Sequence, residues 1–89
     1  MKKLELFKKG LKSPTAQKLG LKVETNWTGI TTFKFPAKPD VTFRIDENAK
    51  LNKDGSLNVA WIDLSGLTVK SGMEIIPSKF IETMINTVA

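Results

Sequence analysis

The positive charge of this 89-residue chain is concentrated at one end. Residues 1–22 hold seven lysines and one acid, a net charge of +6, whereas residues 23–89 hold seven basic and eight acidic side chains. Like charges this close together repel, so such a segment stays compact only beside an anionic partner, or it remains a solvated arm. We therefore divide the chain into a basic N-terminal segment, residues 1–18, and a single domain, residues 19–89.

The basic segment fits either a short helix or an arm. Leu4, Phe7 and Leu11 recur at helical spacing, although the first residues also alternate as in a short strand. Ser13 followed by Pro14 is typical of a helix start, because serine caps the first turn and proline fits its first position.

From residue 21 onward apolar residues alternate with polar ones, which is the period of a half-buried strand. The link Asp54-Gly55 is a pair favoured in two-residue hairpins, and the other links are also short, so we expect antiparallel pairing. The pattern predicts extended segments at residues 21–25, 30–35, 41–45, 58–64, 67–70 and 73–76.

The last segment predicts an amphipathic helix whose apolar stripe is made by Phe80, Ile81, Met84, Ile85 and Val88. The expected fold class is α+β: a small, mostly antiparallel sheet of four to six strands with this C-terminal helix packed on it, plus the basic N-terminal segment. Small chains often gain core by association, so we expect a homo-oligomer through this helix. Its interface residues would be Phe80, Met84 and Val88.

The side chains present argue against catalysis and metal binding. The chain has no cysteine, histidine or tyrosine, which removes the thiolate nucleophile, the commonest general base and the commonest metal ligands. We expect no enzyme, no catalytic residue, no cofactor and no metal. The longest apolar run, residues 59–62, is far too short to span a membrane, and no signal-type apolar stretch follows the first lysines. We therefore expect a cytoplasmic protein.

Nucleic acid is the partner that the lysine-rich segment favours. Lysine outnumbers arginine thirteen to one, and lysine contacts phosphates as a point charge with little readout of base identity. We therefore expect weakly sequence-selective binding of single strands. The candidate contacts are Lys2, Lys3, Lys8, Lys9, Lys12, Trp27 and Arg44.

Plainer interpretations stand beside these hypotheses. A lysine-rich terminus can serve solubility alone, and Trp27, in a predicted turn, either stacks on a base or folds back over the core, which is the commoner fate of an aromatic ring. We expect Trp61 in the core. Phe33 and Phe43 neighbour basic residues, but strand alternation puts the rings inside and the cations in water. The alternative function is a protein–protein adaptor or assembly factor, of the kind that phages and mobile elements encode, acting through oligomerisation.

Overall fold

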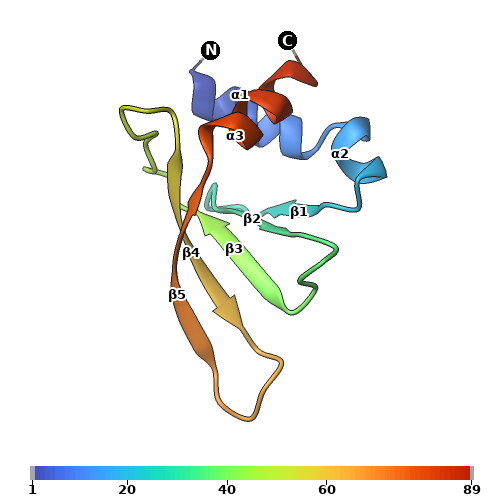
Figure 1. Ribbon diagram of the computed structural model, residues 1–89, viewed down its shortest axis with the longest axis vertical. Coiled ribbons are helices and arrows are strands. Elements are labelled where there is room, and N and C mark those ends of the chain that lie inside the picture. The colour runs from blue at the N-terminus through green and yellow to red at the C-terminus, as the bar shows by residue number, and fades with distance from the viewer. Residues whose placement is uncertain (1, 89) are drawn as a thin grey trace.

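Five antiparallel strands form one sheet in chain order, and the helices gather at one end of the molecule (Figure 1). The computed structural model describes residues 2–88. The expected fold class, an α+β fold with a small antiparallel sheet and a C-terminal helix, is confirmed. In chain order the elements are α1 (Lys3–Leu11), α2 (Pro14–Lys18), β1 (Lys22–Thr25), β2 (Thr31–Lys34), β3 (Val41–Ile45), β4 (Leu57–Asp63), β5 (Lys70–Ile76) and α3 (Ser78–Asn86).

The two faces of the sheet differ in burial. Phe33 and Phe43 are register partners on the face that carries the core, which we call the inner face, and both are buried. Thr32, Arg44 and Ala60 form a neighbouring row that points to the other face, which we call the outer face. This alternation places the aromatic rings in the core and Arg44 in solvent, as the strand pattern predicts.

The first helix is part of the core. Phe7 and Leu11 are 0 % exposed and belong to the same buried cluster as the inner face of the sheet. α1 packs against α3 at Gly10, whose missing side chain lets the backbone of Met84 approach closely. Residues 3–11 therefore form the helix that their apolar spacing predicts, and they do not form an arm.

The start of α2 follows the sequence. Ser13 is its N-cap and is buried, and its Oγ accepts a hydrogen bond from the backbone N–H of Ala16 at 3.2 Å while donating to the carbonyl of Gly10 at 2.7 Å. Pro14 takes the first helical position, where its missing N–H costs nothing. One serine thus connects the end of α1 to the start of α2.

The turn at Asp54-Gly55 forms, but in a different place in the topology from the predicted hairpin. The N–H of Gly55 donates to the carbonyl of Asn52 at 2.9 Å, and Gly55 has a φ of 87°, a conformation that suits glycine. However, the turn lies inside the long link between β3 and β4 and does not join paired strands at its own ends. The residue types of the turn predict that the chain turns here, but they do not predict which strands lie on either side.

Residues 70–76 form one continuous strand where the sequence predicts two short pieces around Gly72. Gly72 is the register partner of Trp61, and the indole lies directly over it: a Cβ at residue 72 would come 2.9 Å from Cζ2 of Trp61. Gly72 therefore leaves room for the indole ring and does not interrupt the strand. Trp61 is half-buried by this contact, so its prediction as a core residue is only partly right.

Candidate nucleic-acid interface

The lysines of the first helix divide into two groups. At about 100° per residue, Lys9 and the acid Glu5 lie on the side of α1 away from the buried Phe7, together with the N-cap residue Lys2 and the C-cap residue Lys12, and Lys8 lies on the flank of that side. Lys2, Lys9 and Lys12 are exposed and Lys8 is half-buried. We call these four residues the lysine face. Because α1 is packed into the core, the backbone positions of these lysines are fixed relative to one another.

Lys3 belongs to the seam between the helices. Its Nζ lies 3.2 Å from Oε1 of Glu82 on α3, and both side chains remain more than half exposed. An exposed ion pair of this kind adds little stability, but it neutralises the cation that faces α3. Lys3 is therefore set apart from the lysine face.

Trp27 stands on the turn between β1 and β2 and is 96 % exposed. The turn is held without it: Oδ1 of Asn26 accepts hydrogen bonds from the N–H of Thr28 at 3.0 Å and from that of Ile30 at 3.1 Å. Gly29 supplies the positive φ that closes the turn. The interpretation that Trp27 folds back over the core is wrong, because the turn projects the indole into solvent.

Glu47 lies between the turn that carries Trp27 and a cavity at the start of α1. Glu47, at the beginning of the β3–β4 link, lies beside the turn, since a Cβ at Gly29 would be 3.6 Å from its Cγ. Glu47 also lines a cavity of about 490 Å³ between the start of α1 and residues 47–51. The charged side chains around this cavity are Lys2, Lys3, Glu5, Lys8, Glu47 and Lys50. The exposed indole and part of the lysine face thus lie at the same end of the molecule.

Arg44 is not part of this region. It lies on the outer face of the sheet, and its Nε donates to Oδ1 of Asp46 at 2.7 Å. α1 packs on the inner side through Phe7 and Leu11, so the sheet lies between Arg44 and the helix that carries the lysine face. The pairing also neutralises the guanidinium, which leaves Arg44 as a strand cation with a local partner.

The residues expected at an oligomer interface serve the fold of the chain itself. Phe80 packs edge-on against Phe7 at 6.1 Å and against Phe35 at 5.5 Å between ring centroids. Met84 is 1 % exposed against α1, whereas Val88 is 39 % exposed. The apolar stripe of α3 is therefore covered by α1 and the sheet, and Val88 alone of the three reaches the surface to a substantial degree.

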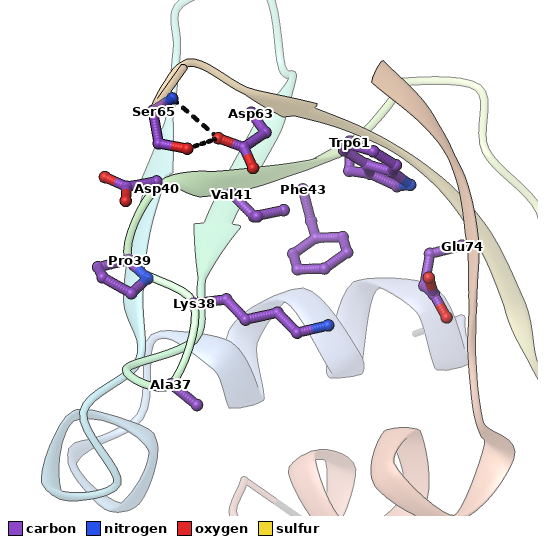
Figure 2. A pocket seen from close by; sticks show the side chains of 10 residues that line it. All are labelled: Ala37, Lys38, Pro39, Asp40, Val41, Phe43, Trp61, Asp63, Ser65 and Glu74. Atoms are coloured by element: carbon purple, nitrogen blue, oxygen red, sulfur yellow. Dashed lines mark hydrogen bonds between the residues drawn. The ribbon is translucent and has the colours of Figure 1, made fainter. Parts of the chain in front are cut away.

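A groove on the inner face was not foreseen from the sequence. Two adjoining cavities of about 460 and 580 Å³ share Ala37, Lys38, Phe43 and Glu74. The first lies between the β2–β3 link and the β4–β5 hairpin, and the second extends to Leu21 and to Phe80 of α3. Figure 2 shows Lys38 reaching across the first cavity, with Trp61 and Glu74 on its far side and Asp63 at its edge. The sequence does not predict the groove, because its lining comes from segments far apart in the chain, among them Leu19 at the end of α2, the β2–β3 link and Phe80 of α3.

Asp63, one of the acidic residues that line this groove, takes part in a turn. Oδ1 of Asp63 accepts hydrogen bonds from the hydroxyl of Ser65 at 2.6 Å and from its N–H at 2.9 Å, as Figure 2 shows. The hydroxyl bond is the main reason that the pKa of Asp63 is below its ordinary value. Such a carboxylate stays ionised and shapes the turn, which is the opposite of a general acid with a raised pKa.

Within residues 2–88, no three side chains of the types His, Cys, Asp or Glu lie together as metal ligands would. None of the helices in this part of the chain has the length and apolar character needed to cross a membrane. No family model, no curated protein and no solved structure matches this chain.

Proposed function

We propose that this protein binds single-stranded nucleic acid without catalysis, through contacts between the lysine face and phosphates, with Trp27 as a stacking group. The observation that carries the proposal is the exposure of Trp27 on a turn that does not need the ring for its own hydrogen bonds. A large aromatic side chain held in water loses its contribution to folding, and a base offers it a flat apolar partner.

The charge distribution supports the same ligand. The helix that carries the lysine face is anchored through Phe7 and Leu11, so the backbones of these lysines stay close together and their like charges repel. Phosphates beside them would remove that repulsion and release counterions. With lysines in place of arginines, binding is expected to be weakly selective for sequence. We place this activity in the cytoplasm, since a chain without cysteine needs no oxidising compartment.

The proposal that the protein is not an enzyme is supported by its chemical groups. The chain contains no histidine, cysteine or tyrosine. Among residues 2–88, the two carboxyl groups with a shifted pKa are Asp54 and Asp63, and hydrogen bonds from nearby serines lower both pKa values. Neither is prepared to donate a proton near neutral pH.

The experiment is fluorescence anisotropy with a labelled oligonucleotide, single-stranded or duplex, over a series of salt concentrations. The wild type is compared with the variant Lys8→Gln, Lys9→Gln, Lys12→Gln. For single strands, a plot of the logarithm of the binding constant against the logarithm of the salt concentration has a slope of about −0.7 per phosphate neutralised. Removing three lysines should therefore make the slope of the variant shallower by about 2.

The matched control removes the same number of charges elsewhere. The variant Lys22→Gln, Lys34→Gln, Lys38→Gln alters β1, β2 and the link after β2 and leaves the lysine face intact. It should retain most of the slope. Equal losses in both variants would show that net charge alone drives binding, and absence of binding by the wild type at low salt would overturn the proposal.

A second candidate function, assembly through protein–protein contact, is favoured by a different observation. Apolar side chains are exposed on and around the β4–β5 hairpin, which Figure 1 shows extending away from the helices. Clustered exposed apolar residues commonly mark interaction surfaces. They are Ile62, Leu64, Leu67, Val69, Met73 and Ile75. Sedimentation velocity over a range of protein concentrations tests whether the chain self-associates.

A further inference from the structure

The two edges of the sheet are built differently. β1 is four residues long and carries Lys22 and Glu24, and short, charged edges are the usual protection against pairing with another chain. β5 is seven residues long, lies at the opposite edge and pairs along its whole length with β4, and no strand of residues 2–88 pairs with its other side. One edge is therefore protected, and the other presents a long row of backbone donors and acceptors.

The side chains of β5 do not prevent pairing. The strand contains no proline, which would interrupt a new ladder. Met73 and Ile75 point to the outer face and are 66 % and 62 % exposed. The two charged residues, Lys70 and Glu74, share the inner face and have opposite signs. When a second β5 runs antiparallel beside the first, the Lys70 of each strand can therefore face the Glu74 of the other.

We propose that a second copy of this chain pairs with β5 through its own β5, antiparallel about a two-fold axis at Gly72. Lys70 then lies opposite Glu74 of the partner subunit, and the symmetry repeats this pair. Ser71 lies opposite Met73 of the partner subunit on the outer face. The result is one continuous antiparallel sheet across both subunits.

Charge selects this register among its neighbours. An axis at Met73 places Lys70 opposite an apolar Ile76 and leaves Glu74 opposite a glycine. An axis at Glu74 brings two carboxylates face to face, which is unfavourable in directly opposed strand positions. The axis at Gly72 alone forms two ion pairs.

Apolar contact follows from the same register. Met73 of each subunit lies diagonally across from its counterpart and from Val69, at about 7–8 Å between Cα atoms, which is within reach of long side chains. Both residues are well exposed in the single chain. Pairing removes part of this apolar surface from water, and the edge hydrogen bonds supply the rest of the interaction.

This interface does not depend on nucleic-acid binding, and it specifies the self-association that the second candidate function requires. All measurements are made without nucleic acid, so the two proposals fail separately. The first measurement is sedimentation equilibrium of the wild type and of Lys70→Glu, Glu74→Lys and the double variant. Each single change creates two like-charge pairs and should weaken the dimer about tenfold, and the double variant should recover the wild-type affinity.

The double variant also controls for effects inside one chain. Lys70 is the register partner of Asp63 on β4, so Lys70→Glu adds repulsion within the subunit. That repulsion persists in the double variant, so recovery there reports on the interface. A wild type that stays monomeric at every concentration would overturn the proposal. So would single changes without effect, or a double variant no better than the singles.

Cysteine cross-linking tests the register. The chain has no native cysteine, so introduced thiols are the sole ones. A disulfide needs Cα atoms about 4.4–6.8 Å apart, which directly opposite residues satisfy and diagonal ones do not. The variant Ser71→Cys, Met73→Cys should form a covalent dimer on mild oxidation, while Met73→Cys alone should not. Efficient cross-linking by Met73→Cys alone would place the axis at Met73 and overturn the proposed register.

Discussion

Gly10 of α1 lies directly against the backbone carbonyl of Met84 of α3, so close that a Cβ at residue 10 would overlap it. The neighbouring atom is backbone and cannot rotate away. The glycine therefore sets the distance between the two helices, and the burial of Phe7 and Leu11 depends on that distance.

Replacing Gly10 should destabilise the protein although alanine is the better helix former. Gly10→Ala gains about 1 kcal/mol of helix propensity but must separate α1 from α3, and overpacking of this kind costs about 1–3 kcal/mol or more. We expect a net loss of unfolding free energy in urea denaturation. Lys9→Ala, on the exposed side of the same helix, is the control and should be near neutral. Equal stability of Gly10→Ala and wild type would contradict the close helix packing.

The contact between Trp61 and Gly72 predicts a coupled pair of mutations. Gly72→Ala puts a methyl group against the indole and should cost about 1–3 kcal/mol of unfolding free energy. In a Trp61→Leu background the same change should cost much less, because the ring is gone. Ser71→Ala, on the opposite face of β5, controls for the strand itself. If the cost of Gly72→Ala were the same in both backgrounds, the indole would not be its cause.

These glycines show where local sequence patterns reach their limit. Alternation and helical spacing predict the sheet, its antiparallel pairing and α3, because those patterns follow from which residues must leave water. Gly10 and Gly72 look like weak points in a helix and a strand. Their role depends on Met84, near the other end of the chain from Gly10, and on Trp61, on the strand beside Gly72, and spacing within one helix or one strand carries no information on such contacts.

The carboxyl of Asp63 predicts a measurable pH effect. Hydrogen bonds from Ser65 lower its pKa below the ordinary value of 3.8, so the folded state holds this proton less tightly than the unfolded state. The stability it contributes is complete above that ordinary value and is lost as the pH falls through the lowered pKa of the folded state. Ser65→Ala should raise the pKa of Asp63 toward its ordinary value and reduce the acid sensitivity of unfolding.

An NMR titration of the side-chain carboxyl carbons measures this change. Asp54 is an internal control, because the hydroxyl and N–H of Ser56 lower its pKa in the same way and Ser65→Ala leaves that turn intact. The pKa of Asp54 should stay constant in the variant. If Asp63 had the same pKa in the variant and the wild type, the hydroxyl of Ser65 would not be the cause of its lowered pKa.

The candidate interface was predictable in part. The sequence shows that the lysines are concentrated, and helical spacing predicts which of them lie away from Phe7. It does not show that Lys3 meets Glu82 or that the sheet separates Arg44 from the lysine face, since both depend on tertiary packing. Nor does the sequence decide between the two interpretations of Trp27, an exposed stacking group or a ring folded over the core, because distant residues determine whether a turn has core beneath it.

The central claim is that Trp27 stacks on a base while the lysine face holds the phosphates. Trp61 is the second of the two tryptophans, so a Trp61→Phe variant makes Trp27 the sole indole emitter. The most direct measurement is the fluorescence of this variant during titration with a single-stranded oligonucleotide at low salt. We predict quenching that saturates, reverses on adding salt and disappears when Lys8, Lys9 and Lys12 are also replaced by glutamine. Trp27 emission that stays unchanged at low salt while anisotropy reports binding would contradict the account.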